Sequence, residues 1–403
     1  MAAAEKLQLS ESFAASSCPK GRLQKATILV VAGETSGEEH AAGLVQEINK
    51  QCSQIQIQWF GSGSHRMAEV GVELLEDVSQ LAAIGPWDAV QNLPSYWNLY
   101  RRILKEVRLR RPRLAILIDF PEFNLKLARR LKQEGVPVCY FIAPQIWAWR
   151  SSRLRQIRKF VDLILVVLPF EQDFYRRNGV EAHFVGNPFL ARLRGVPPSI
   201  GSGPDQEQVV ALLPGSRIQE VHRIFPILLD AAEYVAQQCK VRFWVVKAPD
   251  IPIQNLRQVY RQWARSRRKD LSLEFREEGS AQLLSQADCA IIKSGTSTLE
   301  ATLLQVPFAM VYRMSWPTWI FARLLVRTQN YCLANLVMGE RIVPEFIQWN
   351  ATGDAIGSYL VRLLTQKGEL ENVKKKLREA AVRLGHSDAY CEAARHVREF
   401  LRE

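Results

Sequence analysis

The sequence predicts an α/β protein with two doubly wound domains in tandem and a cleft between them. Three observations support this prediction. The chain has 403 residues, and a single hydrophobic core rarely grows past roughly 250–300 residues, so two domains are expected. Short apolar runs alternate with longer helical patterns, which indicates right-handed crossovers and a parallel sheet covered on both faces. This alternation then restarts after a segment rich in Gly, Pro and Ser.

Each half of the chain contributes its own series of expected strands. The first domain, residues 26–189, has apolar runs at 26–32, 55–61, 114–120, 136–142, 162–170 and 182–186. The second domain, residues 209–365, has them at 209–217 (which ends in a Gly-containing turn), 242–248, 271–275, 289–295 and 307–313. Residues 190–208 are the expected linker. Residues 1–25 lack the apolar core of a secretory signal, and we expect them to form a polar, mobile leader.

Composition narrows the class of protein. The net charge of +12 favours an anionic partner, which leaves a phosphate-bearing substrate, an anionic membrane and nucleic acid open. Basic residues gather at 101–113, 150–159 and 257–269, although any one such run is more often a solvated helix face. The seven cysteines form no CxxC pair, as expected for reduced thiols in a cytosolic protein. The longest apolar stretch, residues 163–170, is far shorter than the about 20 residues of a membrane-spanning helix, so we expect membrane contact to be peripheral.

Ligands of open parallel sheets bind outside the carboxyl ends of the strands, and small or polar residues follow the predicted strands here. The turn VAGETSG brings Gly33, Glu34, Ser36 and Gly37 to the start of a helix, where backbone N–H groups approach an anion or a sugar. It matches neither GxGxxG nor a Walker A motif. Taken alone, this segment is more simply interpreted as an ordinary strand-to-helix turn.

Asp119 follows an apolar run and precedes Glu122 and Asn124. A carboxylate at the carboxyl end of a parallel strand faces the cleft, where it accepts a proton from a hydroxyl nucleophile. The alternative is that Asp119 is the N-cap of a helix that begins near Pro121.

The next expected strand ends in APQIWAWR, which carries Gln145 and Trp147 beside a second tryptophan and an arginine. Aromatic rings next to basic side chains suit a sugar or an acyl chain with a phosphate. A buried tryptophan pair that covers the sheet edge explains the same residues equally well.

Two motifs in the second half are typical of phosphate binding. LLPGSR combines a tight turn at Gly215 and Ser216 with Arg217, whose forked guanidinium suits a diphosphate. KSGTSTLE follows another strand and places Ser294, Gly295 and Thr296 at a helix start, where free N–H groups bind a leaving diphosphate. Glu300 lies one turn further, where it accepts from ribose hydroxyls or simply complements the helix dipole.

Residues 81–107 and 314–328 combine Trp, Leu, Ile and Tyr with Arg and Lys. An apolar face with a basic rim is how a protein sits on an anionic membrane, although two core helices are the simpler interpretation for a protein in general. The residues expected to face a membrane are Ile84, Trp87, Leu93, Trp97, Trp316 and Trp319.

The order of the motifs carries a resemblance. It runs VAGETSG, FGSGSHRM, IDFPEFN, APQIWAWR, LPFEQDFY, FVGNP, LLPGSR, KSGTSTLEA, YRMSWPTWIFARLL and VPEFIQ. This order resembles the lipid-A-disaccharide synthase family over roughly residues 26–350. The family consists of inverting, UDP-using glycosyltransferases of the GT-B type, with two Rossmann-like domains. In such proteins the C-terminal helix usually crosses back onto the first domain, so residues 366–403 are expected to do so or to exchange between protomers of a dimer.

The resemblance also implies a reaction. UDP-2,3-diacylglucosamine and 2,3-diacylglucosamine 1-phosphate join through a β-1,6 linkage, with no metal or other cofactor, at the cytoplasmic face of the inner membrane of a Gram-negative-type bacterium. Asp119 matches the general base that deprotonates the acceptor's 6-hydroxyl, and Asn335 matches a donor-site residue. Glu122 stands where the family often has Asp. The diphosphate site is implied at Arg217, Ser294, Gly295, Thr296 and Thr298.

Two other classes of protein remain as alternatives. A UDP-N-acetylglucosamine 2-epimerase shares the GT-B architecture but needs a polar, closed cleft, whereas residues 81–107 and 314–328 favour an acylated substrate. A basic nucleic-acid-binding protein would carry an RNA-binding or helix-turn-helix signature, and none is present in the sequence. A member of the fold without activity is also compatible with these residues.

Overall fold

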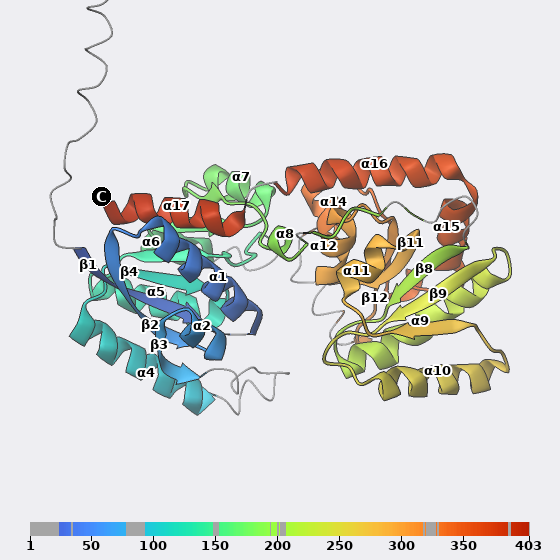
Figure 1. The fold of residues 1–403 in the computed structure, drawn as a ribbon, viewed down its shortest axis with the longest axis horizontal. Coiled ribbons are helices and arrows are strands. Elements are labelled where there is room, and N and C mark those ends of the chain that lie inside the picture. Colours follow the sequence, from blue (N-terminus) through green and yellow to red (C-terminus); the bar gives the residue numbers. More distant parts are fainter. Residues whose placement is uncertain are drawn as a thin grey trace, which may run out of the picture.

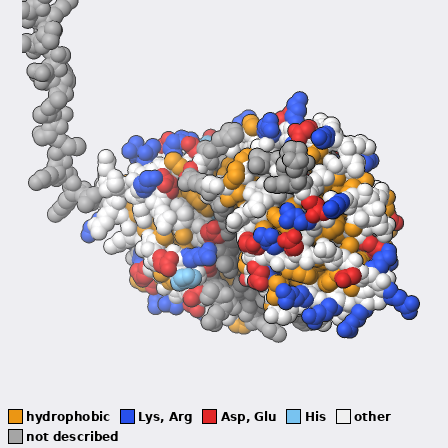
Figure 2. Space-filling view, turned by 45° about the vertical axis from the view of Figure 1, so that its right-hand side comes forward, with side chains coloured by type: hydrophobic (Ala, Val, Ile, Leu, Met, Phe, Trp, Pro, Cys, Tyr) orange, Lys and Arg blue, Asp and Glu red, His pale blue; other side chains and the backbone are white. Residues whose placement is uncertain are grey.

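The computed structural model describes residues 24–33, 35–77, 93–147, 153–193, 195–199, 201, 207–316, 319, 328, 330–385 and 388–402. The predicted leader therefore lies almost wholly outside the described residues. Two parallel sheets form the framework, with strand orders β3-β2-β1-β4-β5-β6-β7 and β10-β9-β8-β11-β12-β13 (Figure 1). Each sheet is doubly wound about its first strand, and Figure 2 shows the surface hollowed between the two lobes.

The first domain contains the elements up to α8. Its strands are β1 (Gln24–Ala32), β2 (Ile55–Gly63), β3 (Val72–Asp77), β4 (Leu114–Ile118), β5 (Val138–Phe141), β6 (Leu163–Val166) and β7 (His183–Phe184). Its helices are α1 (Thr35–Gln51), α2 (His65–Glu69), α4 (Leu93–Arg110), α5 (Pro121–Gln133), α6 (Leu154–Phe160), α7 (Pro169–Arg177) and α8 (Phe189–Arg192).

The second domain contains the remaining elements except the last helix. Its strands are β8 (Gln208–Leu213), β9 (Val241–Val246), β10 (Leu273–Arg276), β11 (Cys289–Lys293), β12 (Phe308–Tyr312) and β13 (Glu345–Ile347). Its helices are α9 (Ile218–Ala236), α10 (Ile253–Arg267), α11 (Ser280–Ser285), α12 (Thr296–Leu303), α14 (Leu333–Met338), the 3-10 turn η2 (Gln348–Asn350), α15 (Gly353–Thr365) and α16 (Lys367–Arg383).

Strand β1 illustrates why these runs form central strands. Successive side chains of a strand point to opposite faces. Leu29 and Val31 belong to the hydrophobic cluster on one face of the first sheet, whereas Ile28 and Val30 belong to the cluster on the other. All four are at most 1% exposed, so the strand is buried on both faces and reads as a continuous apolar run.

Helix α17 (Ala389–Arg402) returns from the second domain to the first, where it packs beside α1 (Figure 1). Its buried residues Ala393, Ala394 and Val397 belong to the same hydrophobic cluster as residues of α1. The hydroxyl of Tyr390 lies 2.9 Å from Nδ1 of His40 on α1. The end of the chain therefore completes the core of the first domain.

The strands differ from the predicted runs mainly at their ends. Strand β4 stops at Ile118 rather than at residue 120, because Asp119 and Phe120 both take φ = 48°. Strand β6 stops at Val166, because Pro169 begins α7. Strands β3 and β13 were not predicted, because β3 is mostly polar and only partly buried, whereas β13 is three residues long, and both lie at sheet edges.

Charge is spread over the surface. In the view of Figure 2, Lys and Arg side chains are interspersed with Asp and Glu over both lobes. Within the described residues, no helix has both the length and the apolar character needed to cross a membrane.

Candidate active site

The turn after β4 holds Asp119 in an uncommon backbone conformation. Asp119 and Phe120 both have φ = 48°, a left-handed conformation that few residues other than glycine adopt. The carbonyl oxygen of Asp119 accepts hydrogen bonds from the Tyr140 hydroxyl at 2.6 Å and from Nδ2 of Asn124 at 2.8 Å. Such strain persists only where neighbouring groups fix it, and it gathers at functional sites. The N-cap position of α5 belongs to Phe120, so the interpretation of Asp119 as the N-cap is wrong.

The turn after β1 lies beside this turn, because Ala32 pairs with Ile118 in the sheet. Gly33 faces the ring of Phe120 so closely that an added Cβ would lie 2.2 Å from Cδ1 of the ring. Only glycine fits there. Glu34 and the side chain of Ser36 lie outside the described residues. The structure therefore brings Gly33 and Gly37 to the same edge of the sheet as Asp119.

Asn124 supports the turn rather than facing solvent. It is fully buried, and its Nδ2 also donates to the carbonyl of Ile118 at 3.2 Å. Among the residues that the structure describes, its Oδ1 has no hydrogen-bond partner. Asn124 therefore acts on Asp119 through the backbone, from the first turn of α5.

The loop after β5 carries Gln145, which is exposed, and Trp147, which is half-buried. Nε1 of Trp147 donates to Oε1 of Glu171 at 3.0 Å. The indole ring packs edge-on against the ring of Phe170, with 4.8 Å between the ring centroids. Oε2 of Glu171 accepts from the Leu168 backbone N–H at 3.1 Å. The fully buried Glu171 therefore anchors the tryptophan loop to the start of α7, a role that the sequence analysis did not assign to it.

Burial raises the pKa of Glu171 to about 7, although the N–H groups of Trp147 and Leu168 oppose the shift. Because this folded pKa is above the ordinary value, the fold favours the neutral acid. That preference is fully present below about pH 4.5 and is lost as the pH rises through 7. We expect the stability of the wild type to fall by on the order of 3 kcal/mol relative to Glu171→Gln between pH 4.5 and pH 8.

Urea denaturation at a series of pH values measures this difference. Asp173→Asn, on the exposed part of the same helix, is the control. A stability difference between wild type and Glu171→Gln that stays constant with pH would contradict the prediction.

In the second domain, the turns after β8 and β11 lie side by side because their strands are paired, with Leu213 opposite Ile292. The carboxylate of Glu220, in the first turn of α9, joins the two turns. It accepts from the backbone N–H of Ser216 at 3.3 Å, from Nη1 of Arg217 at 3.3 Å and from Nζ of Lys293 at 2.9 Å. The two phosphate-binding motifs predicted separately therefore form one cluster. Lys293 and Glu220 are members that the sequence analysis missed.

The start of α12 carries other residues that were predicted to bind the UDP-sugar. Gly295 and Thr296 are exposed and Ser294 is half-buried. Thr298 is buried, and its hydroxyl donates to the carbonyl of Gly295 at 2.7 Å. The carboxylate of Glu300 accepts from the Ser280 hydroxyl at 2.7 Å. Thr298 therefore shapes the turn, while Ser294, Gly295 and Thr296 provide its accessible surface.

Asn335 is fully buried within the framework of the second domain. Its Oδ1 accepts from the backbone N–H groups of Ile342 and Val343. Its Nδ2 donates to the carbonyl of Val343 and to Oε1 of Glu345. These bonds tie α14 to β13. A direct contact between Asn335 and the UDP-sugar stays a prediction.

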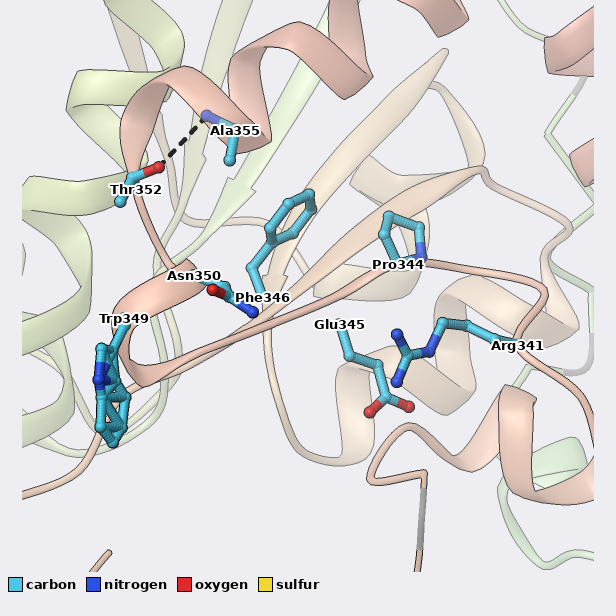
Figure 3. Close-up of a pocket in the computed structure, with 8 residues that line it drawn as sticks. All are labelled: Arg341, Pro344, Glu345, Phe346, Trp349, Asn350, Thr352 and Ala355. Atoms are coloured by element: carbon cyan, nitrogen blue, oxygen red, sulfur yellow. Dashed lines mark hydrogen bonds between the residues drawn. The ribbon is translucent and has the colours of Figure 1, made fainter.

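A pocket of about 410 Å³ opens at the edge strand β13 (Figure 3), and its lining includes none of the predicted site residues. Its lining combines apolar and polar side chains, namely Arg341, Pro344, Glu345, Phe346, Trp349, Asn350, Thr352 and Ala355. Trp349 packs edge-on against Trp316 with 4.6 Å between the ring centroids. One side chain of the pocket therefore contacts the segment that follows β12.

The residues predicted to face a membrane differ in their exposure to solvent. Trp97 is 59% exposed and Trp316 is 58% exposed. The prediction is wrong for Trp319, whose side chain is only 9% exposed. The centroid of its ring lies 6.3 Å from that of Trp349. Ile84, Trp87 and the side chain of Leu93 lie outside the described residues.

Comparison with known proteins covers nearly the whole chain. The family model for lipid-A-disaccharide synthetase matches residues 28–400. A lipid-A-disaccharide synthase of Anaeromyxobacter dehalogenans is 36% identical over 380 residues, which is 93% of this chain and 97% of that protein.

Two solved structures share the fold at low sequence identity. The glycotransferase of kitacinnamycin has a TM-score of 0.58 at 14% identity and covers 94% of this chain and 100% of its own. A putative UDP-N-acetylglucosamine 2-epimerase from Listeria monocytogenes has a TM-score of 0.59 at 11% identity, and the match covers 92% of this chain and 94% of that one.

The solved structures establish the GT-B fold and include both a glycosyltransferase and an epimerase, so the fold alone does not choose between these activities. The sequence relationship does choose, because it spans the turns of both sheets at substantial identity. The chain therefore belongs to the lipid-A-disaccharide synthase family and is a hexosyltransferase.

Proposed function

We propose that the chain transfers 2,3-diacylglucosamine from UDP to the 6-hydroxyl of 2,3-diacylglucosamine 1-phosphate, with inversion at the anomeric carbon. The products are the β-1,6-linked disaccharide 1-phosphate and UDP. Family membership supports the reaction, and the observation that carries it is the strained turn that holds Asp119 at the carboxyl edge of the first sheet. In this proposal the first domain binds the acceptor and the second binds the UDP-sugar.

Each step has a residue assigned to it. The carboxylate of Asp119 takes the proton of the acceptor's 6-hydroxyl as that oxygen bonds to the anomeric carbon. The bond between that carbon and the UDP oxygen breaks through a transition state that resembles an oxocarbenium ion. Negative charge develops on the departing diphosphate, where Arg217 and the N–H groups at the start of α12 stabilise it.

The direct test is to incubate the purified protein with both substrates in detergent and to follow disaccharide formation and UDP release together. Equal amounts of the two products are expected. The epimerase alternative predicts UDP-N-acetylmannosamine from UDP-N-acetylglucosamine, with no acyl-sugar product. Binding of UDP without disaccharide formation, across several acyl lengths, would reject the proposed substrates.

Asn124 is proposed as a positioning residue for Asp119. Asn124→Ala removes two hydrogen bonds to the strained turn, each worth about 1 kcal/mol, so we expect kcat to fall by about 10- to 30-fold. The Kd for UDP should not change, because the turn belongs to the first domain. Calorimetric titration with UDP beside steady-state turnover checks both expectations. A parallel loss of UDP affinity would indicate general unfolding instead.

We also propose that catalysis needs no metal ion, because Arg217 supplies a permanent positive charge beside the departing diphosphate. Addition of excess EDTA is then expected to leave the rate of disaccharide formation unchanged. A rate that falls with EDTA and recovers with Mg²⁺ would contradict this proposal.

We propose peripheral association with the cytoplasmic face of an anionic inner membrane. On α4, Trp97 is 59% exposed and Leu109 is 69% exposed, and several basic residues lie between them. Flotation with phosphatidylglycerol vesicles is expected to carry the wild type and to fail for a Trp97→Ser/Leu109→Ser variant. Light scattering of the wild type without vesicles tests whether the chain forms a homodimer.

A further inference from the structure

The turns after β8 and β11 form the cluster that is proposed to bind the diphosphate. This cluster already contains an anion, the carboxylate of Glu220. Three donors from both predicted phosphate motifs converge on it: the Ser216 backbone N–H, the Arg217 guanidinium and the Lys293 ammonium. These are the kinds of donors that bind phosphate oxygens in proteins. Glu220 therefore holds the contacts that a diphosphate would make at this place.

Gly215 shows how closely the carboxylate approaches the turn. Its φ is +123°, and an added Cβ would lie 2.8 Å from Oε2 of Glu220. The position thus needs glycine for its backbone conformation and for the space that the carboxylate oxygen occupies.

Lys293 is the member of the cluster that depends most on Glu220. It ends the buried strand β11, and its side chain is only 14% exposed, whereas that of Arg217 is 70% exposed. A largely buried ammonium requires an anionic partner, because an unpaired charge in this position is strongly destabilising. In the structure that partner is Glu220, itself 18% exposed.

We propose that the carboxylate of Glu220 occupies the place of the UDP-sugar's diphosphate in the ligand-free chain. When the UDP-sugar binds, its diphosphate displaces this carboxylate and takes over the contacts with Lys293, Arg217 and the Ser216 N–H. The proposal rests on the proposed function of this site and adds Lys293 to the residues that bind the donor. Glu220 keeps Lys293 paired and the turn ordered in the ligand-free chain. When UDP leaves, the carboxylate returns, so Glu220 acts as a competitor that favours product release.

The test is calorimetric titration of UDP and, separately, of uridine into the full-length chain and its variants. Glu220→Gln keeps the side chain's shape but removes the competing charge, so UDP is expected to bind about tenfold more tightly. Lys293→Met should weaken UDP binding by about 10- to 100-fold, as expected for a lost charge-assisted hydrogen bond. Uridine lacks the phosphates, so its affinity should change in neither variant.

Two controls separate displacement from a structural role. Glu233→Gln removes a carboxylate of similar exposure (16%) on the same helix as Glu220, where it pairs with Lys269. Glu233 lies in the last turn of α9, far from the turns that bind the diphosphate in this proposal, so UDP affinity should not change. In the Lys293→Met background, Glu220→Gln should increase UDP affinity much less than in the wild type. The reason is that Glu220→Gln acts mainly by freeing the ammonium of Lys293 for the diphosphate, and this ammonium is absent from the Lys293→Met variant.

Unchanged or weaker UDP binding by Glu220→Gln would overturn the proposal, as would equal losses for UDP and uridine. These outcomes are distinct from failure of the proposed function. Disaccharide formation by the wild type tests that function independently, whereas absence of both UDP binding and disaccharide formation would remove the basis of both proposals.

Discussion

Asp119→Asn is expected to lower kcat by about 10²- to 10⁴-fold, the contribution usual for a general base. The amide keeps the size of the side chain but cannot accept the proton of the acceptor hydroxyl. The hydrogen bonds that hold the turn use the backbone carbonyl of Asp119, so the substitution leaves them in place. UDP affinity and thermal stability should therefore match the wild type, and turnover of both substrates in detergent measures the loss.

Glu122→Gln is the matched control, because it neutralises a carboxylate three residues away. Glu122 is 62% exposed and forms an ion pair with Arg153, whose side chain is 13% exposed, so thermal unfolding beside turnover separates a loss of stability from a loss of catalysis. Turnover close to that of the wild type is expected for this variant. If Asp119→Asn were as active as Glu122→Gln, another group would have to accept the proton.

Arg217→Ala should produce the second large effect, a fall in kcat of about 10²- to 10³-fold, as for loss of a donor that stabilises developing negative charge. Its side chain is 70% exposed and at the N-cap of α9, where it is free of the packing that constrains Lys293. The folded state should therefore lose little stability. Steady-state kinetics with both substrates, beside thermal unfolding, tests the two expectations.

Arg261→Ala, an exposed position on α10, controls for the loss of one positive charge. The effect of Arg217→Ala should also persist at high ionic strength, since a contact made in the transition state is local rather than long-range. A drop in rate that disappears with added salt would point to electrostatic steering of the anionic substrates instead.

The fold could be predicted from the sequence because parallel strands are buried on both faces and so appear as continuous apolar runs. Residues 28–32 and 289–292 are examples, and both became central strands. Strand β13 escaped prediction because three edge residues carry no such pattern. The left-handed turn at Asp119 also escaped, since nothing in the residue types IDFP requires a positive φ.

Prediction of a residue's place in the fold worked where a motif directly follows a strand, as for Gly33, Asp119 and Arg217, which lie after β1, β4 and β8. Their roles in binding and catalysis stay predictions. Prediction failed for groups whose role depends on pairing between distant segments. Lys293 is only the first residue of the motif KSGTSTLE in the sequence, and Glu220 looks like an ordinary first-turn acid until β8 and β11 are placed side by side. Trp319 illustrates the opposite error, because the composition of residues 314–328 suggested a membrane-facing surface, whereas its side chain is only 9% exposed.

The return of α17 fixes the order in which the two domains finish folding during synthesis. The hydrophobic cluster of the second domain is complete once Leu384 has been made, whereas a cluster of the first domain still lacks Ala393, Val397 and Leu401. The domain that the ribosome makes first is thus the last to be closed, and part of its apolar surface over α1 stays uncovered until α17 has been made. Premature termination shortly before Ala389 would yield a finished second domain attached to an open first one.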